Sequence, residues 1–215
     1  MTAPAIIDRP QRRDAAENRE LILVAAAAVL SINPDASVDD IAAAASLSRR
    51  AVYGHFSGRD EIVEQTLTRG ASRIAASVAQ VEHPDALVEL ALLGATLWAE
   101  VEHARALANF ALRGPHRRQV AAALAPLRSR LEHTIERGVR DNDIRSDIPP
   151  KTLARLIEGG ALAVLDEATR ARMSLQRGHR LVILSALSTA GMSWRGAEKL
   201  IDKHPILHVS VGARS

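Results

Sequence analysis

The sequence predicts an all-α protein. Apolar residues recur at steps of three and four along nearly every segment, which is the spacing of one face of a helix. Proline, glycine and serine stand where these segments begin and end. The alternation of β-branched residues between turns that indicates strands is missing. We therefore expect helices packed against helices throughout the chain.

The first helix is expected over residues 14–32, and residues 1–13 are expected to form a flexible arm. The sequence Asn33-Pro34-Asp35 ends the helix. The apolar residues of this segment recur at helical spacing and should form its buried face: Leu21, Ile22, Ala25, Val29 and Ile32.

Two short helices follow, separated by a tight turn at Ser46-Leu47. Ser37 offers a capping hydroxyl and Asp40 lies three residues later, which predicts a helix from there to about Ala45. Ser48 caps the next helix, expected over residues 49–55. Ser57 is expected to cap a longer helix that continues to about residue 81.

The rest of the chain predicts a larger group of helices. Pro126 should kink or divide the longest of them. Residues 205–215 are expected to form a mobile tail. The expected helices cover residues 84–102, 103–113, 116–140, 150–171, 175–190 and 194–203.

Composition excludes several classes of protein. With 47% hydrophobic and 25% charged residues, the chain should fold as a globular protein. Cysteine is absent, which excludes a disulfide framework, a thiolate zinc site and a cysteine nucleophile. No run approaches the ~20 apolar residues of a membrane helix, and no signal peptide is visible, so a cytoplasmic protein without a membrane partner is expected. Motifs for a nucleophile elbow, a phosphate loop or a metal are also missing, so we expect neither an enzyme nor a cofactor.

The basic pI of 9.9 does not by itself indicate a nucleic-acid partner. Residues 1–80 hold nine arginines and ten acidic residues, so the positive excess belongs to the C-terminal part. Two of the five aromatic residues, Tyr53 and Phe56, lie close together in the N-terminal part. This local cluster is more informative than the overall charge.

Residues 37–56 have the pattern of a helix-turn-helix. Ile41, Ala45, Leu47 and Val52 can form one small core, and small alanines allow the two helices to cross closely. The second helix then presents its first turn outward, and this is the part of a helix that reads bases in the major groove. Two arginines, Arg49 and Arg50, occupy that turn, and each guanidinium can pair with O6 and N7 of guanine.

Other residues of the segment suit contacts to phosphate. Ser37 and Ser48 leave hydroxyls and backbone N–H groups at helix N-termini, where a phosphate is favoured. Tyr53, His55 and Arg59 lie at or just beyond the far end of the second helix, within reach of the backbone. The segment thus predicts binding to double-stranded DNA, although two short alanine-rich helices with an arginine pair also occur on ordinary solvated surfaces.

Residues 18–67 resemble the N-terminal domain of the TetR family of transcriptional regulators. The matches are Ser37 and Asp39-Asp40-Ile41-Ala42, then Ser48, Val52-Tyr53 and His55-Phe56, and finally Arg59-Asp60-Glu61-Ile62. The resemblance implies an all-α fold with an N-terminal three-helix DNA-binding domain containing the helix-turn-helix and a larger C-terminal helical domain for ligand binding and dimerisation. It also implies a repressor that a small molecule releases from its operator.

The departures from the family pattern concern the turn and the phosphate contacts. The family usually has glycine where Ser46 lies, so Ser46 must adopt a left-handed conformation or reshape the turn. An aromatic residue is often found at Gly54 and a lysine at Ser57. Without them, we expect Arg49, Arg50 and Arg59 to supply more of the affinity.

A ligand pocket is expected among the helices of residues 84–171, because bundles open cavities between facing helices. Trp98 and Phe110 are the large aromatics there, although such residues are often simply core. The expected lining is Leu97, Trp98, Val101, Phe110, Leu127, Leu131, Ile157 and Ala161. Scattered histidines in this region do not form a metal motif.

The helices of residues 150–171 and 175–190 have broad apolar faces and small residues. A monomer can bury such faces internally, but a helix-turn-helix gains affinity by pairing across a two-fold axis, with reading helices about 34–36 Å apart. We therefore expect a homodimer on a palindromic operator. The expected interface residues are Leu156, Gly160, Val164, Leu181, Leu184 and Leu187.

The sequence as a whole predicts a DNA-binding transcriptional regulator with a small-molecule effector. The expected organisation is a helix-turn-helix domain over residues 14–57, a connecting helix over 58–82 and an effector-binding and dimerisation domain over 83–204. The alternative is a helical small-molecule or partner-binding protein whose helix-turn-helix is weak or vestigial. Replacing Arg49 and Arg50 by alanine separates these interpretations.

Overall fold

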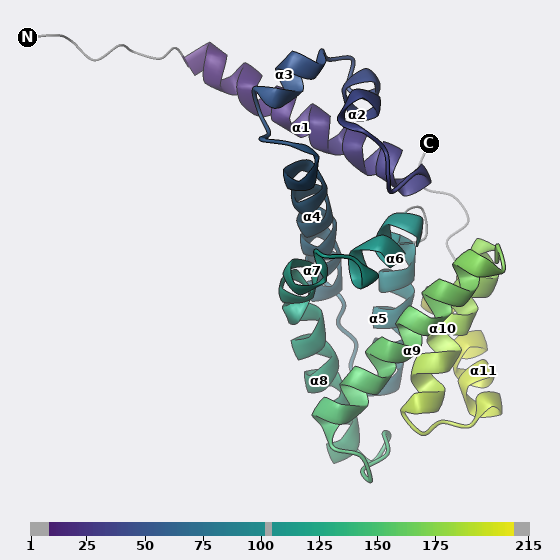
Figure 1. Cartoon of the computed structure of the whole chain (residues 1–215). Helices are drawn as coiled ribbons and strands as arrows, with labels where there is room; N and C mark the ends of the chain where they lie inside the picture. Colours follow the sequence, from purple (N-terminus) through teal and green to yellow (C-terminus); the bar gives the residue numbers. More distant parts are fainter. Residues whose placement is uncertain (1–8, 102–104, 209–215) are drawn as a thin grey trace, which may run out of the picture.

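The computed structural model describes residues 9–101 and 105–208, and all regular structure in these ranges is helical (Figure 1). The all-α prediction is confirmed. The helices are α1 (Arg9–Ile32), α2 (Val38–Ala44), α3 (Arg49–Tyr53), α4 (Arg59–Ala79), α5 (Ala86–Val101), α6 (Arg105–Arg113), α7 (Arg117–Ala123), α8 (Ala125–Arg140), α9 (Pro150–Arg170), α10 (Leu175–Thr189), α11 (Trp194–Lys203) and the 3₁₀ turn η2 (Pro205–Leu207).

Capping and helix-breaking residues in the sequence predicted most helix ends to within two residues of their observed positions. The expected break near Pro126 is present: α7 ends at Ala123, α8 begins at Ala125, and Pro126 stands in the first turn of α8, where it needs no backbone partner. Gly58, rather than Ser57, occupies the N-cap position of α4. The Ser57 backbone N–H instead donates to Glu61 Oε2 at 2.7 Å.

The two ends of the chain differ from expectation. Helix α1 begins at Arg9, within the segment expected to be a flexible arm, and residues 1–8 lie outside the described ranges. At the other end, Pro205–Leu207 forms η2, and Leu207 is buried against α5. Leu207 thus anchors the beginning of the expected tail. Residues 209–215 lie outside the described ranges.

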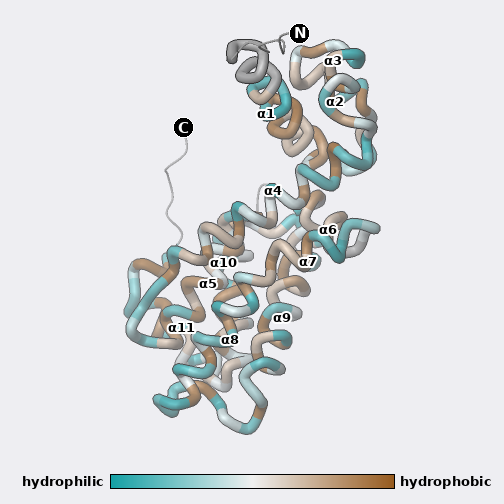
Figure 2. The backbone as a smooth tube through the Cα atoms, turned by 90° about the vertical axis from the view of Figure 1, so that its left-hand side faces the viewer, coloured by the Kyte–Doolittle hydropathy of each residue, from teal (hydrophilic) through white to brown (hydrophobic). Residues whose placement is uncertain are grey.

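Helices α1, α2 and α3 form a small unit at one end of the molecule, and α4 leads from it into the larger bundle (Figures 1 and 2). In the small unit, Ile41 and Val52 are buried, and Ala45 and Leu47 pack beside them. The buried face of α1 differs from the one expected, because Leu21 and Ile32 are exposed. The residues that face the core are Ile22, Ala25, Ala26 and Leu30.

The larger bundle is built around α5, which packs on α8 and α10, while α10 also packs on α9. Within residues 9–101 and 105–208, no helix combines the length and apolar character needed to cross a membrane.

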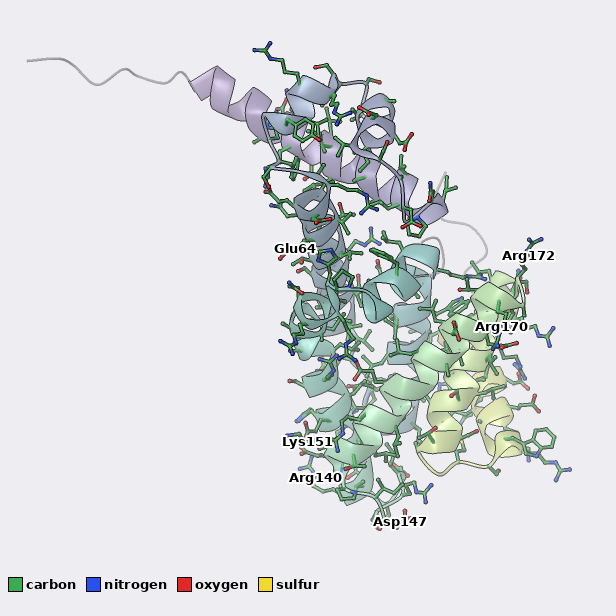
Figure 3. The ribbon with its side chains drawn as sticks, viewed as in Figure 1. Glu64, Arg140, Asp147, Lys151, Arg170 and Arg172 are labelled. Carbon is green, nitrogen blue, oxygen red and sulfur yellow. The ribbon has the colours of Figure 1, made fainter. Side chains whose placement is uncertain are left out.

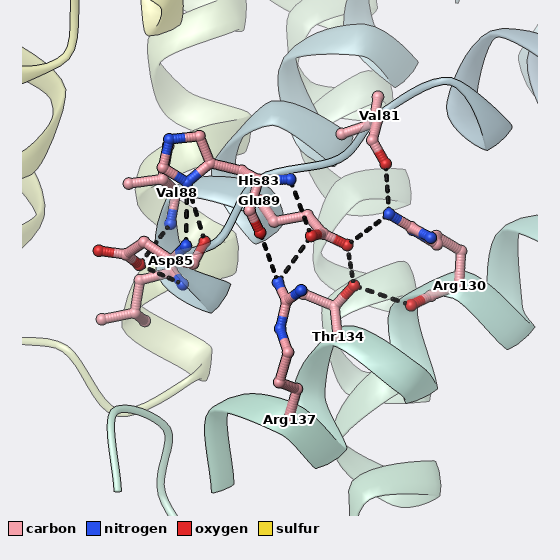
Figure 4. Close-up of polar contacts among 9 residues, drawn as sticks. Val81, His83, Asp85, Val88, Glu89, Arg130, Thr134 and Arg137 are labelled. Atoms are coloured by element: carbon pink, nitrogen blue, oxygen red, sulfur yellow. Dashed lines mark hydrogen bonds and ion pairs between the residues drawn. The ribbon is translucent and has the colours of Figure 1, made fainter. Parts of the chain in front are cut away.

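A buried carboxylate joins α5 to α8 (Figure 4). The side chain of Glu89 is only 1% exposed, and its Oε2 accepts from Arg137 at 2.6 Å and from the His83 N–H at 3.1 Å. Its Oε1 accepts from the Thr134 hydroxyl at 2.7 Å and lies 3.0 Å from an Arg130 nitrogen. Burial opposes ionisation, but these partners outweigh it and hold the pKa of Glu89 below its ordinary value. The cluster fixes the loop between α4 and α5 to α8.

Candidate DNA interface and ligand cavity

The turn between α2 and α3 is tight because Ser46 adopts a left-handed conformation, with φ of 55°. The Leu47 N–H donates to Ala42 O at 2.9 Å, and the Ser46 N–H donates to Ala43 O at 3.1 Å, which closes the end of α2. The expectation for Ser46 is therefore confirmed. The turn keeps the geometry that glycine usually supplies, and the strain is borne by a side-chain-bearing residue.

The capping hydroxyls are engaged within the protein. Ser37 Oγ accepts from the Asp40 N–H at 3.2 Å, donates to Asp40 Oδ2 at 2.7 Å, and completes the expected capping box. The hydrogen bonds from the Ser37 side chain and backbone hold the pKa of Asp40 below its ordinary value. Ser48 Oγ accepts from the Ala51 N–H at 3.1 Å. A phosphate at the start of α2 must therefore approach an aspartate, which makes the start of α3 the more favourable position.

The two arginines at the start of α3 differ in their surroundings. Arg49 Nη1 lies 2.7 Å from Asp39 Oδ2 of α2, and its guanidinium stands 5.5 Å from the centre of the Tyr53 ring. A hydrogen bond to Tyr53 and the charge of Asp39 raise the pKa of Arg49. Arg50 is exposed and makes no side-chain hydrogen bond or ion pair within the described part of the chain. Arg50 is thus the arginine of α3 whose guanidinium is not engaged by another described residue.

The residues expected to touch the DNA backbone lie on different parts of this surface. Tyr53 is exposed at the end of α3, and His55 is half-buried in the next turn. Arg59 does not project freely, because its Nε donates to Ala36 O at 2.8 Å and its Nη2 donates to Pro34 O. Its observed contacts fasten α4 to the loop between α1 and α2.

Arg19 is a positioning residue that the sequence reasoning missed. Its guanidinium lies 4.2 Å from the centre of the buried Phe56 ring and donates to His55 O and, at 2.8 Å, to Gln65 Oε1. It therefore holds the segment after α3 between α1 and α4. No local pattern marks these contacts, because their partners lie at least 36 residues away in the sequence.

A cavity of about 310 Å³ lies where the small unit meets the bundle. Helices α1, α4, α5, α6, α9 and α10 contribute walls, together with residues of α7 and α8. The lining is mainly apolar, and Leu23, Val24, Ala27 and Ser31 of α1 form one side. Among the described residues, no group of three histidine, aspartate or glutamate side chains is placed to hold a metal ion.

Part of the expected lining surrounds this cavity. Leu97, Trp98, Val101, Leu127 and Ala161 line it. Leu131 and Ile157 instead line a separate space of about 20 Å³, deeper between α5, α8 and α9, and Phe110 belongs to neither lining. The contribution of α1 and α4 was not expected, because the cavity was placed wholly within the bundle.

The expected dimer residues divide into surface and core. Leu156 is 50% exposed, and Gly160, Leu181 and Leu184 are half-buried on the same pair of helices. Val164 and Leu187 are buried inside the chain, so they lie beneath this face rather than on it. An alanine at Gly160 would bring its Cβ within 2.9 Å of Ser185 Oγ, which shows how closely α9 and α10 pack.

Comparison with known families identifies the helix-turn-helix. Residues 22–66, which contain α2, α3 and parts of α1 and α4, match the family described as bacterial regulatory proteins, tetR family. The TetR-family match ends inside α4, before the bundle that holds most of the cavity. A comparison with curated proteins gives no match.

Solved structures share the fold of most of this chain. SmeT, the repressor of the Stenotrophomonas maltophilia multidrug efflux pump SmeDEF, is 24% identical with a TM-score of 0.63, over 79% of this chain and 88% of SmeT. FadR from Bacillus subtilis, in complex with stearoyl-CoA, is 17% identical with a TM-score of 0.67, over 80% and 97% of the two chains. RolR, in complex with resorcinol, is 12% identical with a TM-score of 0.60, over 95% and 98%.

Proposed function

We propose that this protein is a homodimeric transcriptional repressor that a small molecule releases from a palindromic operator. The observation that carries the proposal is the TetR-family helix-turn-helix, in which the first turn of α3 presents an unpaired Arg50 to solvent. In this proposal α1–α3 bind DNA, α4 connects them to the larger bundle, and the remaining helices bind the effector and a second copy of the protein. The alternative of a vestigial helix-turn-helix is less favoured, because its caps and turn are fully formed.

Arg50 should contact a base directly, while Arg49 should serve mainly to hold α3 in position against α2. The Asp39 carboxylate neutralises Arg49 in the free protein, so a contact between Arg49 and a guanine requires that ion pair to rearrange. Backbone contacts should come from the N–H groups at the start of α3 and from Ser48, Tyr53 and His55. Arg59 should contribute through the α1–α2 loop that it fastens, and Ser37 through the cap of α2.

The homodimer should form through the exposed strip of α9 and the facing part of α10. Leu156, Gly159 and Ala163 are exposed along α9 at helical spacing, with charged residues such as Lys151 and Arg170 towards its two ends (Figure 3). An apolar strip bordered by charge is typical of an interface between copies. A two-fold arrangement would place two α3 helices on one face of the duplex.

Release should follow from a ligand in the cavity that α1 helps to form. A molecule bound between α1, α4 and the bundle prefers one placement of the small unit, and the operator prefers the placement that fits two half-sites. SmeT is a repressor, and FadR and RolR were solved with small organic ligands, which supports a ligand-responsive repressor with this fold.

The proposal is tested by selecting bound duplexes from a random pool and then measuring the affinity of variants for the selected sequence. We expect a palindrome, and we expect Arg50→Ala to lose about 5- to 100-fold in affinity and in preference over a scrambled duplex. Arg140→Ala is the matched control, because Arg140 is exposed at the end of the bundle remote from α3 (Figure 3) and should change the affinity less than about twofold. Selection without any enriched sequence, or equal losses in both variants, contradicts the proposal.

A further inference from the structure

A carboxylate lies beside the two arginines at the start of α3. Asp39 is in the first turn of α2, and its Oδ2 stands 2.7 Å from Arg49 Nη1. Both side chains are 59% exposed, so the ion pair lies at the protein surface. DNA is a polyanion, and a carboxylate beside a DNA-binding surface opposes contacts to phosphate. The position of Asp39 therefore needs an explanation other than affinity for DNA.

The capping of α2 does not supply that explanation. The capping box uses Asp40, whose Oδ2 accepts from the Ser37 N–H at 2.8 Å and from the Ser37 hydroxyl at 2.7 Å. An acid in the first turn also complements the helix dipole, and Asp40 already provides one. The side chain of Asp39 instead contacts Arg49 of α3, ten residues further along the chain.

The contact engages one arginine of α3 and leaves the next one available. The Arg49 guanidinium contacts both Asp39 and Tyr53, with Nη2 lying 3.4 Å from the Tyr53 hydroxyl. Arg50 has no corresponding partner among the described residues. Asp39 thus cancels one of the two positive charges at the start of α3, and the charge that it cancels is that of Arg49.

We propose that Asp39 is a specificity-determining residue, which keeps Arg49 from the phosphates and so lowers the affinity for DNA that lacks the operator sequence. This inference rests on the proposed function, in which α3 binds DNA. Binding to nonspecific DNA comes almost entirely from phosphate contacts, so the loss of one arginine weakens it directly.

The operator complex should lose less. There, base contacts add to the affinity and fix the register of α3, and Arg50 can make such a contact without leaving a partner. The Asp39–Arg49 pair also joins α2 to α3, which helps to hold Arg50 in that register. The same ion pair therefore weakens nonspecific binding and supports the specific contact.

The test compares binding to the selected operator and to a scrambled duplex of the same composition. Affinities of the wild type and Asp39→Asn are measured by fluorescence anisotropy between about 50 and 200 mM salt. We expect Asp39→Asn to bind the scrambled duplex about 3- to 10-fold more tightly and to lose at least about threefold in preference for the operator. The slope of log K against log salt on the scrambled duplex should steepen by about 0.9 for each copy bound, because each gains one phosphate contact.

A double variant separates an action through Arg49 from simple charge repulsion. In an Arg49→Ala background, Asp39→Asn should change the affinity for the scrambled duplex less than about twofold, because no arginine is left to release. The matched control is Asp143→Asn, which removes the same charge from the exposed connection between α8 and α9, remote from α3 (Figure 1). It should change either affinity less than about twofold. Circular dichroism checks that all variants keep the helix content of the wild type.

Three results contradict the role of Asp39. They are an unchanged affinity of Asp39→Asn for the scrambled duplex, an equal gain on both duplexes, and a gain that persists in the Arg49→Ala background. If the wild type prefers its operator and any of these is observed, only this inference is overturned. A wild type that binds both duplexes equally, or neither, overturns the proposed function together with the inference.

Discussion

Replacing Glu89 by glutamine should destabilise the protein strongly, although the two side chains have nearly the same shape. One carboxylate oxygen accepts from Thr134 and forms an ion pair with Arg130, and the other accepts from Arg137 and from the His83 N–H. A glutamine keeps one accepting oxygen and places an NH₂ donor against the second pair. The substitution therefore removes two charge pairs and leaves a buried donor facing other donors.

The size of the effect follows from the exposure of the partners. One unit pair near a protein surface is worth about 4 kcal/mol at 4 Å, and this attraction is offset in part by the cost of burying Glu89. Arg130 and Arg137 are 27% and 26% exposed, so water compensates part of the loss when the carboxylate is removed. We expect a loss of about 2–4 kcal/mol in the free energy of unfolding, or a fall of about 5–12 °C in Tm.

Urea unfolding of the wild type, Glu89→Gln and Glu82→Gln measures this effect at neutral pH. Glu82 is exposed in the same loop, and its substitution should change the stability by less than about 0.5 kcal/mol. Because the folded-state pKa of Glu89 lies below its ordinary 4.5, its stabilisation is complete above that value and is lost as the pH falls through the folded-state pKa. The wild type and Glu89→Gln should therefore converge in acid. A loss below about 1 kcal/mol, or a constant difference down to low pH, refutes the reasoning.

Two further predictions concern the turn and the proposed dimer. Ser46→Gly removes a side chain from a left-handed residue and should raise the unfolding free energy by about 0.5–1 kcal/mol in thermal or urea unfolding, whereas an equal loss at this position contradicts the strain argument. Leu156→Glu should shift the protein from dimer to monomer in analytical ultracentrifugation, with unchanged helix content, because Leu156 is half exposed in the protomer. Ile206→Glu, at another exposed apolar residue, should remain dimeric, and equal dissociation of both variants argues against the α9–α10 face.

Local features of the helix-turn-helix could be predicted from sequence, because their partners lie within a few residues. The capping box of Ser37 with Asp40, the cap at Ser48 and the left-handed turn at Ser46 depend on spacing and on backbone sterics. The difference between Arg49 and Arg50 could not be predicted in this way. It depends on how α2 crosses α3 and brings Asp39 to one guanidinium rather than the other.

The other features could not be predicted from the sequence, because periodicity does not show which of several equally apolar helix faces packs inward. Helices α9 and α10 are apolar over wide faces, so periodicity alone did not separate the exposed Leu156 from the buried Val164 and Leu187. Similarly, no pattern links Glu89 to Arg137, which lies 48 residues away. The cavity wall on α1 was missed for the same reason, since it forms only when distant helices meet.

Helix α1 has two roles in the structure: it packs on α2 and, through Arg19, holds the segment after α3, and it also forms one wall of the cavity. In the proposed function, the ligand lowers the affinity for the operator, and such coupling is reciprocal, so the operator must lower the affinity for the ligand by the same factor. A molecule of this protein on DNA should therefore respond at a higher ligand concentration than a free one. A cell with many operator copies would need more inducer for the same response, and the threshold would depend on gene dosage as well as on the affinity of the cavity.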